Sequence, residues 1–234
     1  MPGIIFMRKY WGAEMTDFAR LMNDYFVKYL IGQKGSGNNT LKTYRDTFVQ
    51  LLEFMDEKKQ IQADRIEVDN FSYDIINEFL EYLEKEKGVS ISTRNNRLAA
   101  IRSFFKYTGY HEPKYLNISS SIREISKKKA ENRQMNYLSI NAMEHFLNSF
   151  DTTDYKELRC FCIVLLLYES GARVTELCNV HRYDLHLEKP FTLVLHGKGN
   201  KIRSVPLDGL VVDTISNYIQ KYEVHDDDFL FFNA

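Results

Sequence analysis

The feature that most constrains this chain is an apolar run that ends at a glycine and is followed at once by one arginine. Residues 161–167 read Phe-Cys-Ile-Val-Leu-Leu-Leu, which predicts a helix buried on both flanks, and Ser170-Gly171 is a typical stop for such a helix. A new helix is then predicted to begin at Arg173. Arg173 and Glu176 would share one face of it, because helical side chains three residues apart meet.

This arginine has two interpretations. A guanidinium at the positive end of a helix presents a planar fork of donors to an anion, ideally a phosphate. The same residues also fit a structural Arg173–Glu176 pair at a helix start, with no ligand.

A second stretch lies downstream, where residues 193–207 read Leu-Val-Leu-His-Gly-Lys-Gly-Asn-Lys-Ile-Arg-Ser-Val-Pro-Leu. It predicts two short strands, at 192–195 and 202–205, joined by a turn rich in glycine. Lys198 would lie at the tip of this hairpin. By itself such a lysine also fits a solvated turn residue, and the stretch lacks the Gly-Lys-Ser/Thr ending of a nucleotide-binding loop.

Together the two stretches resemble the tyrosine recombinase (phage integrase) family. Residues 171–177, Gly-Ala-Arg-Val-Thr-Glu-Leu, resemble its first arginine box, and residues 197–207 resemble its lysine-bearing β-hairpin. The resemblance extends over nearly the whole chain. It implies a mainly α fold, with an N-terminal four-helix SAM-like core-binding domain and a partial α+β catalytic domain that contains a small β-hairpin sheet.

The pattern of helices and breaks predicts how the chain is divided. We expect an N-terminal extension (1–13), a helical core-binding domain (14–110), a basic linker (111–136) and the first part of a catalytic domain (137–234). The linker assignment rests on Pro113, the serine run 119–121 and the lysine run 127–129, which interrupt the helical periodicity. Helices are expected at about 14–31, 39–58, 73–87, 93–108, 140–150, 155–169 and 209–222, with an apolar stretch at 229–232.

Charge is distributed unevenly along a chain whose formal net charge is only −1. Between Gly88 and Gln134 ten Lys and Arg stand against three Asp and Glu, a local excess of seven positive charges. Such asymmetry predicts a positive face of the kind that contacts DNA. Solvated linkers are sometimes basic as well, so the charge alone leaves both readings open.

The resemblance implies where DNA would bind. In the family, the second and fourth helices of the core-binding domain lie near the major groove, and residues 39–45 and 92–105 resemble those helices. From the residues alone these are also ordinary exposed faces of a helical bundle. Lysines and arginines would contact phosphates, while Arg94 or Asn95 could reach base edges. The residues expected at DNA are Lys42, Thr43, Arg45, Arg94, Asn95, Arg97, Lys127, Lys128, Lys129, Lys201 and Arg203.

The resemblance also implies a reaction that uses no metal and no cofactor. A tyrosine hydroxyl displaces the 5′-oxygen of a DNA phosphodiester and forms a 3′-phosphotyrosyl link. Arg173 would clamp the phosphoryl oxygens, Lys198 would protonate the leaving 5′-oxygen, and Glu176 would support Arg173. The family's His-x-x-Arg box and nucleophilic tyrosine are not found after Lys198, and Tyr218 and Tyr222 are better explained by packing. We therefore expect residues 1–234 to bind DNA without cleaving it.

The expected setting is cytoplasmic, with double-stranded DNA as the partner. No apolar run reaches the roughly 18 residues that span a bilayer, the first residues do not resemble a secretory signal, and the three cysteines read as small buried hydrophobes. Family members assemble as tetramers on DNA, whereas this chain is expected to be a monomer in solution. Two alternatives remain, a non-catalytic DNA-binding remnant or regulator derived from a recombinase, and a helical adaptor with no nucleic-acid role.

Overall fold

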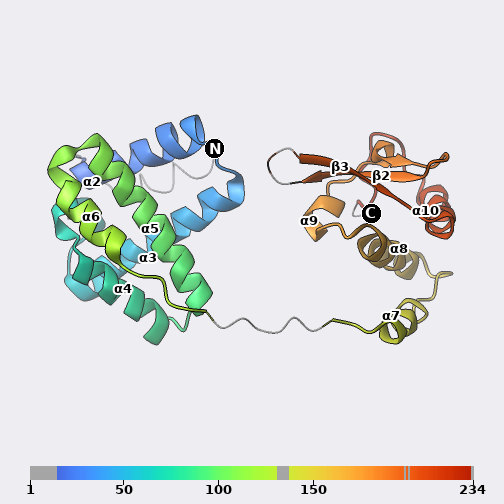
Figure 1. Ribbon diagram of the computed structural model, residues 1–234, viewed down its shortest axis with the longest axis horizontal. Coiled ribbons are helices and arrows are strands. Elements are labelled where there is room, and N and C mark those ends of the chain that lie inside the picture. Colours follow the sequence, from blue (N-terminus) through green and yellow to red (C-terminus); the bar gives the residue numbers. More distant parts are fainter. Residues whose placement is uncertain (1–14, 131–136, 198, 200, 233–234) are drawn as a thin grey trace. The chain divides into compact units, whose positions relative to one another are not determined.

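A computed structural model of the chain describes residues 15–130, 137–197, 199 and 201–232 (Figure 1). The chain divides into two compact units, residues 1–133 and 134–234. Each unit has a hydrophobic core of its own.

The first unit is helical. Helix α2 (Asp17–Asp24) begins at Thr16, whose hydroxyl accepts a hydrogen bond from the Ala19 backbone, and it continues as the π-helical segment η1 (Tyr25–Gln33). The elements that follow are α3 (Asn38–Lys59), η2 (Ala63–Arg65), η3 (Val68–Asn70), α4 (Tyr73–Lys85), α5 (Ile91–His111), η4 (Pro113–Tyr115) and α6 (Leu116–Glu124). Helices α3, α4 and α5 begin and end within three residues of the predicted bounds.

Helix α5 supplies the centre of this unit's core. The Phe104 ring lies 5.2 to 5.5 Å, centroid to centroid, from the rings of Phe18, Tyr25, Phe48 and Phe105. These rings come from α2, η1, α3 and α5, and several of the pairs meet edge to face, a favourable geometry for aromatic contacts. Each fully buried phenylalanine contributes about 1.5–3 kcal/mol through removal of its surface from water.

The linker prediction is wrong for residues 113–124, which fold onto α5 as η4 and α6. Tyr115, Ile122 and Ile125 are buried in the core of the first unit. The serine run, read as a linker signal, instead provides small side chains at a close helix contact: a Cβ added to Gly109 would lie 2.7 Å from Ser119. The boundary between the units falls at 133/134, near the end of the predicted linker.

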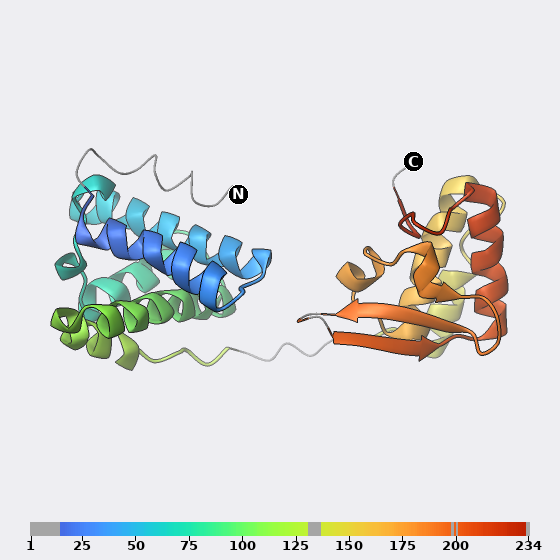
Figure 2. The same ribbon diagram turned by 90° about the horizontal axis from the view of Figure 1, so that it is seen from above.

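The second unit combines helices with a small sheet. Its helices are α7 (Ile140–Leu147), α8 (Tyr155–Ser170), α9 (Val174–Leu177) and α10 (Gly209–Tyr222), with a 3₁₀ turn η5 (Arg182–Asp184). Strands β1 (Leu185–His186), β2 (Thr192–Gly197) and β3 (Lys201–Pro206) form an antiparallel sheet in the order β1-β2-β3. Figure 2 shows β2 and β3, in orange, running side by side in front of helices of this unit.

The sheet and helices of the second unit enclose one core. Leu193 and Leu195 of β2 are fully buried and belong to the same cluster as Leu166 of α8 and Ile215 of α10. The predicted hairpin and the helix at 209–222 are confirmed. Strand β1 was not predicted, since two residues are too few to show a period. The cysteine prediction holds for Cys162, whereas Cys160 and Cys178 are exposed.

The described residues contain neither a membrane-spanning helix nor a metal-binding cluster. No helix among them is long and apolar enough to cross a membrane. They contain no group of three or more His, Cys, Asp or Glu that could hold a metal ion.

Candidate functional site

The turn between α8 and α9 places Arg173. Helix α8 ends at Gly171, whose φ of 57° is the left-handed conformation that glycine adopts without strain, and the Ser170 hydroxyl accepts a hydrogen bond from the Ala172 backbone. Arg173 is the residue before the first turn of α9, as the sequence predicted. Its side chain is 71% exposed.

Glu176 lies beneath this arginine and is buried, with its side chain 4% exposed. Its carboxylate accepts hydrogen bonds from the Arg173 backbone N–H at 2.9 Å and from Arg173 Nη1 at 2.6 Å. It also accepts from Arg203 Nη2 at 2.7 Å and Nη1 at 3.2 Å. The side-chain bonds from Arg203, together with the Arg173 backbone bond, lower the pKa of Glu176 to about 2. One ionised carboxylate therefore holds two guanidiniums at the surface.

Arg203 reaches Glu176 because of the register of the sheet. Leu195 of β2 lies opposite Arg203 of β3, so the two side chains lie on the same face of the sheet. Leu195 is buried there, and Arg203 on this face extends to the carboxylate of α9. The sequence suggested Arg203 as a phosphate contact and gave no sign of this bond, since strand register is not visible in a short hairpin.

Gly197 is a residue of the site that the sequence did not single out. A Cβ at this position would lie 3.1 Å from Glu176 Oε1 and 3.3 Å from the Lys201 carbonyl oxygen. The end of β2 can approach the buried carboxylate this closely only without a side chain. The sequence predicts only a turn residue at this position.

The predicted lysine lies outside the described residues. This lysine is Lys198; Gly197 and Lys201, on either side of the turn, lie directly opposite each other in the hairpin. Lys201 is exposed. Through Glu176 and Arg203, the arginine box and the lysine-bearing hairpin are joined although these two residues are 27 positions apart.

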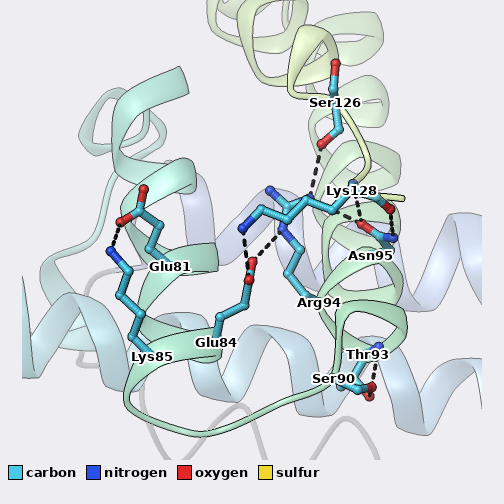
Figure 3. A network of polar contacts seen from close by, with 9 residues as sticks. All are labelled: Glu81, Glu84, Lys85, Ser90, Thr93, Arg94, Asn95, Ser126 and Lys128. Atoms are coloured by element: carbon cyan, nitrogen blue, oxygen red, sulfur yellow. Dashed lines mark hydrogen bonds and ion pairs between the residues drawn. The ribbon is translucent and has the colours of Figure 1, made fainter. Parts of the chain in front are cut away.

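In the first unit, the prediction that Arg94 faces outward is wrong. Arg94 is 5% exposed; its Nη1 donates to the Ser126 carbonyl at 3.1 Å, and its Nε lies 3.2 Å from Glu84 (Figure 3). Helical spacing carried the signal, because Arg94 shares a stripe with Leu98, Ile101 and Phe105, which are all buried. Asn95 is half-buried, and its amide bonds to the backbone of Lys128.

The other predicted DNA residues of this unit divide into two places. Arg97 of α5 donates to the Thr43 carbonyl oxygen of α3 at 3.0 Å, so the predicted faces of these two helices do adjoin. Lys42 is exposed, and Arg45 forms an ion pair with Asp46 at 2.9 Å. Lys127, Lys128 and Lys129 are exposed on the segment that follows α6.

Both tyrosines of α10 are held by packing, as the sequence predicted. Tyr218 is fully buried and donates to the Leu230 carbonyl oxygen at 3.0 Å, and burial raises its pKa to about 12. The Tyr222 hydroxyl donates to the Tyr155 carbonyl oxygen, and burial raises its pKa as well. Neither hydroxyl is free to attack a phosphate.

Comparison with known proteins matches both units. Residues 136–234 match the model of the phage integrase family, and residues 24–109 match that of the phage integrase N-terminal SAM-like domain. An integrase/recombinase of Sinorhizobium fredii, y4rD, is 30% identical over 83% of this chain and 70% of its own length. The tyrosine recombinase XerD of Listeria innocua is 29% identical over 85% of this chain and 64% of its own length.

Solved structures share the fold. The XerH site-specific recombinase bound to difH matches 99% of this chain and 70% of its own with a TM-score of 0.63 at 20% identity. The Tn1549 transposon integrase in complex with transposon right end DNA matches 90% of this chain and 70% of its own, also with a TM-score of 0.63 and 20% identity. The chain spans 57% to 70% of the length of the curated relatives that it matches.

Proposed function

Because the chain belongs to the tyrosine recombinase (phage integrase) family, we propose that it takes part in site-specific cleavage and rejoining of double-stranded DNA through a phosphotyrosine intermediate. Residues 1–234 would supply the DNA-binding unit and the first catalytic elements. The relatives solved with bound DNA support duplex DNA as the partner.

The observation that carries the proposal is the pair of guanidiniums held by one buried carboxylate. Glu176 neutralises one of the two positive charges, so the site keeps a net positive charge at the surface. Arg173 is the better phosphate ligand, because it is largely exposed and gives Glu176 only one of its terminal nitrogens. Donors fixed in advance stabilise the charge that develops on phosphoryl oxygens in the transition state.

Further roles are proposed for the neighbouring residues. Glu176 positions Arg173, and Arg203, whose two terminal nitrogens both contact Glu176, ties the hairpin to the arginine box. Lys198 is assigned as the general acid that protonates the leaving 5′-oxygen. Lys201, three residues further along the chain, is exposed and is assigned to a neighbouring phosphate.

In the first unit, the surface where α3 meets α5 is proposed to contact the DNA backbone. Lys42, Thr43 and Arg45 come from α3 and Arg97 from α5, and the bond between Arg97 and Thr43 brings the two sets together. Contacts of this kind set the position and orientation of a protein on the duplex, while sequence is read at base edges.

We infer that residues 1–234 by themselves bind DNA without cleaving it, since both tyrosines of α10 are packed and carry raised pKa values. Assembly as tetramers on DNA belongs, in this proposal, to complete family members. The chain alone is proposed to be a monomer in solution and to act in the cytoplasm.

Two measurements test the proposed function. Fluorescence anisotropy with duplex DNA should give binding that weakens linearly on a log–log plot as salt is raised, because phosphate contacts release counterions. Incubation with nicked duplexes carrying candidate recombination sites should leave no protein covalently attached to DNA in a denaturing gel. Absent or salt-insensitive binding would support the helical adaptor instead, and a covalent adduct would show that the chain holds a nucleophile.

A further inference from the structure

An amide side chain near the start of α5 contacts the backbone of the segment that leaves the first unit. Asn95 Nδ2 donates to the Lys128 carbonyl oxygen at 2.8 Å, and the Lys128 backbone N–H donates to Asn95 Oδ1 at 3.1 Å. Both backbone groups of one residue are thus satisfied by one side chain, as a neighbouring strand would satisfy them. We call residues 126–129 the exit strap (Figure 3).

Two further residues hold the exit strap. Arg94 Nη1 donates to the Ser126 carbonyl oxygen at 3.1 Å. Glu84 of α4 lies with one carboxylate oxygen 2.9 Å from Lys128 Nζ and the other 3.2 Å from Arg94 Nε. Because Arg94 is buried and Glu84 is mostly covered, this network joins α4, α5 and the strap at a fixed place. Figure 3 shows the Glu84 carboxylate reaching the side chains of both Lys128 and Arg94.

The network leaves two lysines of the strap uncommitted. Lys128 gives its ammonium to Glu84, whereas Lys127 and Lys129 are exposed and form no ion pair with the residues that the structure describes. The Lys127 backbone lies between two held residues, Ser126 and Lys128, and Lys129 follows directly after the second of them. Fixing a backbone in advance removes conformational entropy that would otherwise be lost on binding.

We propose that Asn95, Arg94 and Glu84 are positioning residues that hold the exit strap so that Lys127 and Lys129 contact the DNA backbone. This proposal rests on the proposed function, and it replaces direct base contact by Arg94 and Asn95, whose polar groups are used within the chain. Asn95 acts through the two lysines and does not itself touch DNA.

The contact between Asn95 and the exit strap can be tested without DNA. In the whole chain, Asn95→Ala should speed hydrogen exchange at the Lys128 amide and trypsin cleavage after Lys127 and Lys129, while the unfolding midpoint of the first unit changes little. Asn96→Ala is the matched control, because Asn96 is the next residue of the same helix and is exposed. Equal hydrogen exchange at Lys128 in the two variants would show that Asn95 does not hold the exit strap.

A double-mutant cycle tests the role in DNA binding. Lys127→Ala/Lys129→Ala should make the negative slope of log K against log salt shallower by about 1.8, since each phosphate contact contributes about 0.9 to its magnitude. Asn95→Ala should weaken binding by roughly threefold to tenfold with the slope unchanged, because every charge remains and only positioning is lost. In the Lys127→Ala/Lys129→Ala background Asn95→Ala should have no further effect.

The outcomes separate the two proposals. Additive effects of Asn95→Ala and the lysine substitutions would overturn the positioning role, since a merely structural residue would act in either background. If the unaltered chain does not bind DNA, the proposed function fails and the DNA role of the strap fails with it. The exchange result would then still decide whether Asn95 clamps the strap.

Discussion

At the scale of single residues, the second unit depends on Glu176, whose two oxygens accept four hydrogen bonds from two arginines. An ionised carboxylate accepts all four bonds through its two oxygens, whereas a neutral amide has only one oxygen that can accept. A buried group with this many donors around it is costly to change, because each donor that loses its acceptor is left facing another positive charge.

Replacing Glu176 by Gln should therefore destabilise the second unit. The amide keeps the shape of the side chain, but its NH₂ group would face N–H donors of Arg173 or Arg203. Thermal unfolding followed by circular dichroism should show a lower midpoint for Glu176→Gln than for Glu188→Gln, which changes an exposed carboxylate of the same unit. Equal midpoints would mean that the two arginines do not need this charge.

The stability that Glu176 contributes should depend on pH in a specific way. The folded-state pKa of Glu176, about 2, lies below the ordinary value of 4.5, so its stabilising effect is complete above pH 4.5 and is lost as the pH falls toward 2. The difference in unfolding free energy between the unaltered chain and Glu176→Gln should be constant from pH 7 to about pH 5 and shrink below that. Urea titrations at several pH values measure it; a difference that grows on acidification would contradict the assignment.

Individual residues also show how far the sequence could be interpreted. Arg173 and Glu176 were predicted to pair, and they do, because a glutamate at the third position of a helix reaches back to the residue that precedes the helix. Arg94 was predicted to face outward by its charge, although its spacing from Leu98 and Ile101 placed it on the buried side. Arg203 and Gly197 could not be assigned, since their contacts with Glu176 depend on strand register and on a close approach between elements far apart in the chain.

At the scale of elements, the close contact between α5 and α6 is the feature that the sequence concealed. Glycine and serine usually indicate loops, yet here the missing side chain of Gly109 and the small one of Ser119 let two helices approach closely. Helix boundaries marked by caps were predicted well: α10 starts after Asp208, whose carboxylate accepts a hydrogen bond from the Leu210 backbone. Elements without such a mark, α6 and β1, were missed.

Gly109→Ala should separate α5 from α6. The added methyl would lie 2.7 Å from Ser119 Cβ and Oγ, so the helices must shift, at a cost of about 1–3 kcal/mol typical of overpacking. Urea unfolding should show the loss. Adding Ser119→Gly removes the atoms that the methyl meets, so the double variant should be more stable than the sum of the two single changes predicts. Additive effects would show that the two positions are not in contact.

Gly197→Ala tests the end of the hairpin in the same way. The methyl would press on both the Glu176 carboxylate and the Lys201 carbonyl, and the second unit should lose about 1–3 kcal/mol of stability. Gly209→Ala is the control, because its methyl would meet only Phe191, at 3.7 Å, and alanine favours the helix that starts there. A control that is destabilised as much as Gly197→Ala would point to a general effect of the substitution.

At the scale of the whole molecule, the two units have separate cores, and this separation predicts separate unfolding. Calorimetry of the chain should show two transitions. Gly109→Ala should lower only the transition of the first unit and Gly197→Ala only that of the second. One transition that both substitutions shift equally would show that the units unfold together.

The contact between Asn95 and Lys128 also limits how far the chain can extend beyond Lys128. From Lys128 to Ser139, the residue that caps α7, the chain has eleven steps, so these two points can be no more than about 36–40 Å apart even when the chain is fully stretched. One turn of duplex DNA measures about 34–36 Å. Whatever path the chain takes, its two anchor points cannot be separated along a straight duplex by much more than a single helical repeat.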